Sequence, residues 1–378
     1  MNGHDESGLP AGYARARAAT GGASLAGLEG LEWAQRRLHP PETPRLRQQL
    51  GPVRDRLEEA LDALGSVAPP PGLEPFHAQL ASGAGETLAA LGRFLDPAPP
   101  QEAVARVLES LRLGCRALEA FYPLRSVLKP FGRYFVEPPV HPRLESLDPD
   151  PPPAFGAGVG LHRGGSDDDP DARGGFSLYV PEWLSGETPR PLVVALHGGS
   201  GHGRDFLWTW LREARSRGFL LLAPTSVGPT WSLDAPPRDA LRLRSMVEWV
   251  RARWPVDGER ILLTGLSDGA TFTLLAGLDE EAPYTALAPV SGVLHPLNVS
   301  TGNLERARGR RIYQVHGALD WLFPPALARM ARDELAKAGA ALIYRELPDL
   351  SHTYPREENG RILDWFDPKL ALPAAAAD

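Results

Sequence analysis

The feature that most constrains this chain's fold is an alternation of short apolar runs with helical segments over residues 156–370. Runs of strand length stand at 191–196, 219–223, 261–264, 286–290, 311–315 and 341–346, and helical periodicity at 205–217, 238–253, 269–278, 324–338 and 357–366. Strands that are apolar throughout are buried on both faces, and their alternation with helices is typical of a parallel sheet. We therefore predict an α/β fold: a mostly parallel sheet covered by helices on both faces, preceded by a hairpin of residues 159–162 and 176–180.

The first third of the chain has a different periodicity. Leu50, Val53, Leu57, Leu61 and Leu64 recur at three- and four-residue steps, which places them on one face of a helix. Two further helical runs cover residues 73–95 and 104–121, and proline-rich breaks stand at 69–71 and 97–100. The apolar faces of these helices must be buried. We predict a small helical unit that either covers the rest of the chain as a lid or forms a dimer contact.

A chain of 378 residues exceeds what one compact core usually holds, which favours two units. We predict, in order, a disordered tail (1–23), the N-terminal helical unit (24–136), a linker (137–155), the sheet domain (156–370) and a second tail (371–378). The linker is predicted because that segment is rich in proline and aspartate.

Charge and composition exclude several classes of partner. The formal net charge of −7 gives no electrostatic reason to expect nucleic acid or an anionic membrane. No apolar run approaches the length of a membrane span, and the polar, acidic residues 1–10 lack the basic and apolar regions of a signal peptide. Cys115 is the only cysteine, so an intrachain disulfide is excluded. We expect a cytoplasmic protein.

The strongest chemical signal is the sequence GLSDG at residues 265–269, an instance of the G-x-S-x-G motif. It follows a strand-like run at 260–264 and opens a helical run at 270–277, which is the context of a nucleophile elbow. Glycines at both ends let strand and helix approach, while the strained turn projects the serine above the sheet. The helix N-terminus then faces the negative charge that develops on an attacked carbonyl. We predict that Ser267 is a nucleophile.

A nucleophilic serine needs a general base, and the base needs a carboxylate that orients it. In hydrolases with a nucleophile elbow these residues follow the serine in the order Asp or Glu, then His. His352 follows the last predicted strand and is the predicted base. Asp320, in the loop after the strand at 311–315, is the predicted acid. Asp349 is its competitor, although it stands too close to His352 in sequence to reach across the imidazole easily.

An oxyanion hole needs backbone N–H groups aimed at the tetrahedral intermediate. The sequence HGGSG at residues 197–201 follows the strand run at 191–196, and glycines there let the backbone approach a substrate closely. We expect one donor to be the N–H of Asp268, the residue after the nucleophile. The second donor is predicted to be the N–H of Gly199, with Ser200 as the alternative.

These elements together resemble the α/β-hydrolase superfamily over about 156–370, and two of its groups most of all. They are the phospholipase/carboxylesterase-like serine esterases and the polyhydroxybutyrate-depolymerase and feruloyl-esterase-like group. The resemblance implies an α/β-hydrolase fold with Ser267 as nucleophile, Asp320 as acid and His352 as base. The chain departs from the pattern at Asp268, where many carboxylesterases carry Gln, and in its helical unit, which is not part of the basic fold.

The expected activity is hydrolysis of a small carboxylic ester through an acyl-enzyme, without a metal or organic cofactor. Trp231, Trp321 and Phe323 stand in loops at the expected rim of the site and are predicted to line an aromatic substrate pocket. A thioesterase or peptidase could use the same residues, and a catalytically silent hydrolase fold could act as a binding module. The helical unit suggests a homodimer as the alternative to a lid.

Overall fold

The computed structural model describes residues 9–97, 99–165, 169 and 171–373, and its internal contacts divide the chain into two compact units. The first unit is Met1–Phe135 and the second is Val136–Asp378.

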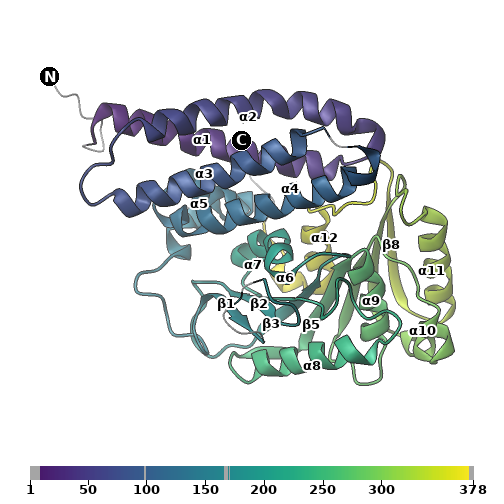
Figure 1. Ribbon diagram of the computed structural model, residues 1–378. Helices are drawn as coiled ribbons and strands as arrows, with labels where there is room; N and C mark the ends of the chain where they lie inside the picture. Colours follow the sequence, from purple (N-terminus) through teal and green to yellow (C-terminus); the bar gives the residue numbers. More distant parts are fainter. Residues whose placement is uncertain (1–8, 98, 166–168, 170, 374–378) are drawn as a thin grey trace. The chain divides into compact units, whose positions relative to one another are not determined.

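The first unit is a bundle of helices joined by short connections (Figure 1). Its α-helices are α1 (Ala11–Arg36), α2 (Thr43–Gly65), α3 (Glu74–Leu95), α4 (Pro100–Phe121) and α5 (Lys129–Tyr134), with 3₁₀ turns at Pro40–Glu42 and Tyr122–Ser126. The predicted apolar stripe is buried at Leu50, Leu57 and Leu64. Gly83 of α3 packs directly against the Phe121 ring of α4, since a Cβ at this position would lie 2.6 Å from that ring.

The prediction of a disordered tail over residues 1–23 is wrong for residues 11–23, which form the first turns of α1. This stretch is rich in alanine, glycine and threonine, so its hydrophobic pattern is weak, yet Tyr13, Ala14 and Ala16 are buried in the bundle. Thr20 Oγ1 also lies 2.9 Å from the Ala60 carbonyl oxygen of α2. Small side chains allow close helix packing, and that tertiary packing stabilises a helix that the pattern does not reveal. Residues 1–8 lie outside the described residues.

The second unit is built on an eight-stranded sheet with the order β1-β2-β4-β3-β5-β6-β7-β8. β1 pairs antiparallel with β2, and β2 with β4, whereas every other neighbouring pair is parallel. The strands are β1 (Gly160–Gly164), β2 (Phe176–Val180), β3 (Arg190–Leu196), β4 (Leu220–Pro224), β5 (Val256–Leu266), β6 (Ala286–Val290), β7 (Arg311–Gly317) and β8 (Ala341–Leu347). The predicted α/β fold and its initial hairpin are confirmed.

Helices fill the crossovers of this sheet (Figure 1). They are α6 (Gly203–Phe206), α7 (Leu211–Arg217), α8 (Pro237–Arg251), α9 (Asp268–Gly277), α10 (Leu297–Ser300), α11 (Pro325–Lys337) and α12 (Glu358–Phe366), with 3₁₀ turns at Leu207–Thr209, Asn303–Ala307 and Pro368–Leu370. One core cluster joins strand residues such as Val194 and Leu263 to Leu243 of α8 and Phe272 of α9. The inner strands are mostly buried because helices cover them, as their continuous apolar sequence predicts, whereas the edge strands β1 and β8 are partly exposed.

The segment predicted as a linker is folded onto the second unit. It contains a 3₁₀ region at Pro138–Leu147, whose apolar residues Val140, Leu144 and Leu147 pack with Trp183. Arg215 of α7 is fully buried and pairs with Asp148 (2.6 Å) at the end of this segment. The segment predicted as a linker (137–155) is therefore packed rather than free over these residues, because an apolar cluster and a buried ion pair hold them.

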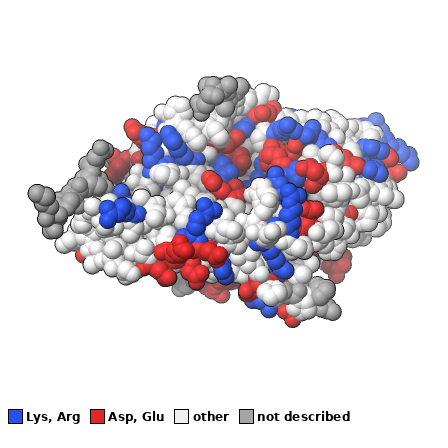
Figure 2. All heavy atoms as spheres, turned by 90° about the horizontal axis from the view of Figure 1, so that it is seen from above, with Lys and Arg blue, Asp and Glu red and all other residues white. Residues whose placement is uncertain are grey.

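No helix among the described residues is long and apolar enough to cross a membrane. On the face drawn in Figure 2, basic and acidic side chains are intermixed and no extended patch of a single sign stands out.

Candidate active site

Ser267 lies in a turn that only glycine neighbours allow. It connects β5 to α9 with φ 57° and ψ −119°. A Cβ on Gly265 would lie 2.6 Å from the backbone carbonyl of Gly269, and a Cβ on Gly269 would lie 2.4 Å from the His197 carbonyl oxygen. Real Cβ atoms do not approach backbone so closely, so both positions require glycine. The Ser267 N–H donates to the Val290 carbonyl (2.9 Å), which holds the turn against β6.

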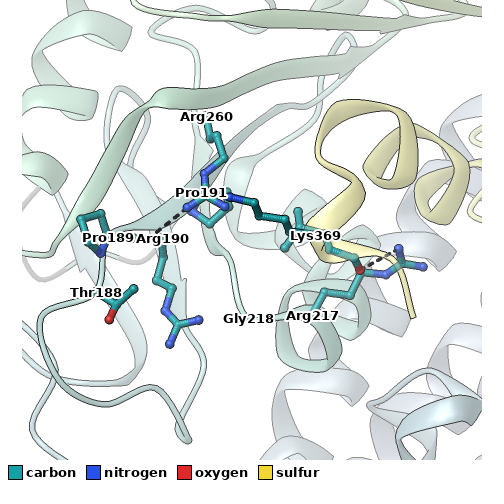
Figure 3. A pocket seen from close by; sticks show the side chains of 9 residues that line it. Thr188, Pro189, Arg190, Pro191, Arg217, Gly218, Arg260 and Lys369 are labelled. Carbon is teal, nitrogen blue, oxygen red and sulfur yellow. Dashed lines mark hydrogen bonds between the residues drawn. The ribbon is translucent and has the colours of Figure 1, made fainter. Parts of the chain in front are cut away.

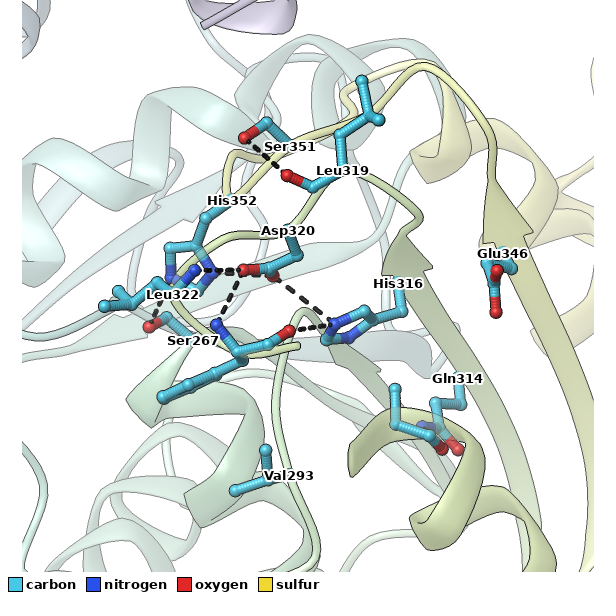
Figure 4. A network of polar contacts seen from close by, with 12 residues as sticks. Ser267, Val293, Gln314, His316, Leu319, Asp320, Leu322, Glu346, Ser351 and His352 are labelled. Atoms are coloured by element: carbon cyan, nitrogen blue, oxygen red, sulfur yellow. Dashed lines mark hydrogen bonds and ion pairs between the residues drawn. The ribbon is translucent and has the colours of Figure 1, made fainter. Parts of the chain in front are cut away.

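Three side chains from separate loops meet at this turn (Figure 4). Ser267 Oγ lies 2.9 Å from His352 Nε2, and His352 Nδ1 lies 2.8 Å from Asp320 Oδ2. Since an ionised carboxylate only accepts hydrogen bonds, His352 carries its hydrogen on Nδ1 and offers Nε2 to the serine hydroxyl. The structure thus brings together the residues predicted as nucleophile, base and acid.

The carboxylate of Asp320 is held by backbone as well as by the imidazole. Its Oδ1 accepts hydrogen bonds from the N–H groups of Leu322 (3.0 Å) and Phe323 (2.8 Å). These two bonds leave Oδ2 directed at His352. Asp349, the competitor for the acid position, is an exposed residue, and the carboxylate that contacts the imidazole is that of Asp320.

His316 is a contact of Asp320 that the sequence analysis did not assign to the site. It is fully buried, and its Nε2 lies 2.8 Å from the Phe323 carbonyl oxygen and 3.4 Å from Asp320 Oδ2. A carbonyl only accepts, so His316 carries its hydrogen on Nε2. Burial lowers the pKa of His316 below its usual value, which keeps the ring neutral behind the carboxylate. Its position four residues before Asp320, at the end of β7, was the available sequence signal.

The loop after β3 presents backbone N–H groups near the nucleophile. Among the described residues, the N–H groups of Gly199 and Asp268 donate to no backbone or side-chain acceptor. The Ser200 N–H, by contrast, donates to the Pro229 carbonyl (2.8 Å). Ser200, the alternative oxyanion donor, is therefore already engaged, whereas the two preferred donors are open.

His197 begins this loop and is held from two sides. Its Nε2 accepts a hydrogen bond from the Ser226 N–H (3.1 Å), so its Nδ1 carries the hydrogen and donates to the Gly198 carbonyl (2.7 Å). The indole N–H of Trp231 donates to the His197 carbonyl (2.7 Å). Both contacts come from the loop after β4, so that loop sets the path of the glycines.

Arg173, from the hairpin region before β2, connects the same two loops. Its guanidinium donates to the carbonyls of Gly201 (3.1 Å) and Gly228 (2.6 Å) and to Ser226 Oγ (2.7 Å). A planar guanidinium with several donors suits this bridging role, which a lysine ammonium could not reproduce. The sequence offered no signal for Arg173, since it stands far from every motif.

The carboxylate of Asp268 lies against the loop of residues 197–201. Its Oδ2 accepts a hydrogen bond from Thr230 Oγ1 (2.7 Å), and it would lie 2.7 Å from a Cβ placed on Gly199. A side chain at position 199 would therefore collide with this carboxylate. The departure from Gln at position 268 places a partly buried negative charge beside the predicted oxyanion donors.

The three aromatic residues predicted to line a pocket occupy different places. Trp231 is 2% exposed and stacks on Phe272 in the core, so the expectation of a rim position is wrong for it. The Phe323 ring meets the His352 imidazole edge-on at 5.2 Å between centroids, and Trp321 is 49% exposed beside Asp320. Only Phe323 and Trp321 therefore stand where a substrate could touch them.

No group of three or more His, Cys, Asp or Glu side chains in the described part of the chain is arranged to hold a metal ion. What the site offers is a hydroxyl within hydrogen-bonding distance of an imidazole, a carboxylate that contacts the same imidazole, and two backbone N–H groups without an acceptor among the described residues.

Residues 243–367, which include Ser267, Asp320 and His352, match the family described as phospholipase/carboxylesterase. Feruloyl esterase B of Neurospora crassa is 29% identical over 128 residues, covering 31% of this chain and 43% of that protein. The chain thus spans less than half the length of this curated relative.

Two solved structures of esterases are weakly similar. A thermostable esterase has a TM-score of 0.41 at 20% identity and covers 52% of this chain and 57% of its own. An acetyl xylan esterase from Aspergillus awamori has a TM-score of 0.44 at 18% identity and covers 55% of this chain and 98% of its own. The strand order, the elbow and the family match together show that the second unit has an α/β-hydrolase fold and that the chain resembles serine esterases of the phospholipase/carboxylesterase family.

Proposed function

We propose that this chain is a carboxylic ester hydrolase that forms an acyl-enzyme on Ser267. The observation that carries the proposal is the continuous hydrogen-bonded series from Ser267 through His352 to Asp320, at 2.9 and 2.8 Å. The family match and the feruloyl esterase relative support an ester as the substrate.

In the proposed mechanism His352 Nε2 takes the hydroxyl proton as Ser267 Oγ attacks the ester carbonyl carbon. Asp320 holds the imidazole and stabilises its charged form. His352 then gives the proton to the alcohol oxygen as the carbon–oxygen bond breaks. A water molecule next attacks the acyl carbon, passes a proton to His352, and releases the acid while Ser267 regains its hydrogen.

The negative charge on the carbonyl oxygen would be stabilised by the N–H groups of Gly199 and Asp268. The engagement of the Ser200 N–H with Pro229 favours this pair over the alternative. Removal of one such donor typically lowers kcat by about 10²–10³ in serine hydrolases.

The substrate is proposed to carry an apolar acyl or aryl group. The loop that holds Asp320 exposes Leu319 (43%), Trp321 (49%) and Leu322 (49%), an unusual concentration of large apolar side chains beside a polar site. Phe323 completes this rim against His352. An aromatic acyl ester such as a feruloyl ester is therefore a reasonable first substrate to test.

The first experiment is labelling of the purified chain with a fluorophosphonate probe, followed by hydrolysis of p-nitrophenyl esters of increasing acyl length. Wild type should react with the probe, and Ser267→Ala should not react while it keeps its fold by circular dichroism. Labelling of Ser267→Ala to the wild-type extent would contradict the proposal.

The second candidate is a thioesterase or peptidase with the same residues, since the triad does not by itself select the leaving group. Matched thioesters and aminoacyl amides of one acyl group would separate these activities by their kcat/KM values. A chain that reacts with neither probe nor substrate would instead be a silent hydrolase fold that acts as a binding module.

For the helical unit of residues 1–135 we propose a homodimer contact, with a lid over the site as the alternative. Val104 (52%) and Leu108 (39%) of α4 are exposed one helical turn apart, which supports the contact. Light scattering of the full chain and of residues 136–378 tests the dimer. Faster probe labelling of the shorter chain, with no change in the number of subunits per particle, would favour the lid.

A further inference from the structure

The second unit carries a basic pocket at the end of the sheet opposite Ser267. Whereas Ser267 follows the carboxyl end of β5, the pocket lies where strands begin, with Arg190 as the first residue of β3 and Gly218 just before β4. Its volume is about 290 Å³. Arg190, Arg217, Arg260 and Lys369 line it, together with smaller residues such as Thr188 (Figure 3), and none of its described lining residues is acidic.

Two of the four cations have carboxylate partners behind the pocket wall. Arg217 pairs with Glu137 (2.6 Å) and with Asp364 (2.7 Å). Arg260 pairs with Asp257 and Asp367, both at 2.7 Å. These pairs compensate the charges of the two arginines and fix their side chains.

In the described part of the chain Arg190 has no carboxylate partner, and Lys369 acts only at longer range on Asp257, whose pKa it helps to lower. Within the described residues the Arg190 side chain makes no hydrogen bond or ion pair, and its Nε is buried without a partner. Burial and the nearby charge of Arg260 lower the pKa of Arg190 below its usual value. Lys369, which is exposed, makes no ion pair within this same part of the chain. A partly desolvated cation without a counterion is costly unless a ligand supplies the opposite charge.

We propose that this pocket binds a small doubly charged anion, phosphate or the phosphate group of a monoester, through Arg190 and Lys369. The charge of Arg190, which has no carboxylate partner, and that of the exposed Lys369, which makes no ion pair among the described residues, together match the charge of such an anion near neutral pH. The guanidinium offers a planar set of donors suited to phosphate oxygens, and the ammonium adds a mobile point charge at the open side. The pocket exceeds the size of a phosphate ion, so a short organic substituent fits. This site is separate from the proposed ester site and goes beyond that function.

The test is calorimetric titration of the full chain with sodium phosphate and, separately, with glycerol phosphate, at constant ionic strength set with chloride. Arg190→Gln and Lys369→Gln are the test variants, and Arg332→Gln, which changes a partly exposed arginine outside the pocket, is the matched control. Arg190 has no side-chain partner to lose, so its replacement should not disturb folding. Circular dichroism checks this point, and the exposed Lys369 gives a second variant.

The proposal predicts saturable one-to-one binding of phosphate by wild type and by Arg332→Gln. In Arg190→Gln the affinity for phosphate should fall at least about tenfold, because a charge-assisted contact is lost. At ten times the dissociation constant, phosphate should also raise the wild-type unfolding midpoint by about 4 °C. Tighter binding of glycerol phosphate than of phosphate would identify a monoester as the ligand. Equal affinity in Arg190→Gln and wild type, no saturation, or an equal effect of chloride, which means an adventitious ion only, would each overturn the proposal.

Discussion

The elbow and the loops that face it reach their geometry by different physical means. At the elbow, Gly265 and Gly269 leave no room for a side chain, and the turn follows from backbone sterics within five residues. The loop of residues 197–201 is instead held by donors that come from elsewhere, among them Arg173 and Trp231. Asp320 is likewise fixed by its own loop and by His316. Local sterics leave a motif in the sequence, whereas distant hydrogen bonds leave none.

The largest effect should come from the acid. Asp320→Asn keeps the size of the side chain but cannot hold His352 in the tautomer that accepts the serine proton, so kcat should fall by about 10⁴. Stopped-flow or steady-state hydrolysis of a p-nitrophenyl ester measures this loss.

Asp349→Asn is the matched control, because it makes the same change at the competing carboxylate. Its kcat should stay within about twofold of wild type, as expected for a surface substitution away from the reacting groups. A reversal of the two results would assign the acid to Asp349.

Next in size is the steric requirement of the elbow. Gly269→Ala would place a Cβ 2.4 Å from the His197 carbonyl oxygen, so the free energy of unfolding should fall. The expected loss is about 3 kcal/mol, the upper part of the range for overpacking. Urea unfolding measures it. Gly258→Ala, whose nearest neighbour is a guanidinium at 3.4 Å, should change little. Equal losses of unfolding free energy in both variants would mean that the elbow has no steric requirement beyond that of an ordinary glycine.

A change at Arg173 tests whether the loop of residues 197–201, the proposed source of an oxyanion donor, depends on distant hydrogen bonds. Arg173→Gln removes the bridge to Gly201 and Gly228, so the Gly199 N–H should lose its alignment. We expect kcat to fall about 10- to 100-fold with a smaller change in KM, since misplaced oxyanion donors act on the transition state. Arg310→Gln, which also breaks an arginine–carbonyl bond but at Tyr284, is the control. An unchanged kcat in Arg173→Gln would mean that the position of the loop does not depend on the hydrogen bonds of Arg173.

The smallest effect concerns the pH dependence of stability. The pKa of His316 is lowered in the folded chain by burial, so the unfolded chain binds this proton more readily. Stability from this group is therefore present above the unfolded pKa and decreases as the pH falls below about 6.5 towards the folded value. The slope cannot exceed about 1.4 kcal/mol per pH unit for one group.

Chemical unfolding of wild type and His316→Gln between pH 7.5 and pH 5, values chosen about the ordinary histidine pKa, checks this expectation. Wild type should lose more stability than the variant over that interval. The same variant should also lower kcat moderately, since it perturbs the carbonyl that His316 holds, and a parallel pH dependence in both proteins would exclude His316 as the titrating group.

Much of the fold could be predicted because its cause is local. The continuous apolar strands and the helices between them predicted a covered, mostly parallel sheet, and the second unit has one. Helix α1 could not be predicted in the same way. Its small residues carry little periodic signal, and packing against α2 and α3 decides its state. The packing of residues 137–147 could not be predicted for a related reason. Their proline content is typical of a linker, but it gives no sign of the ion pair between the buried Arg215 and Asp148 at the end of the segment.

By itself the sequence determined the elbow at Ser267 and the nature of the sheet, because each depends on sterics or periodicity within a few residues, and the general order of such hydrolases pointed to the proposed acid and base. Only the tertiary structure shows that Trp231 packs in the core and that His316 contacts Asp320. It alone also shows that Arg173 donates a hydrogen bond to the loop of residues 197–201 and that Arg190 lines a basic pocket. These contacts join residues far apart in the chain, and nothing in their local sequence specifies which partners the fold brings within hydrogen-bonding distance.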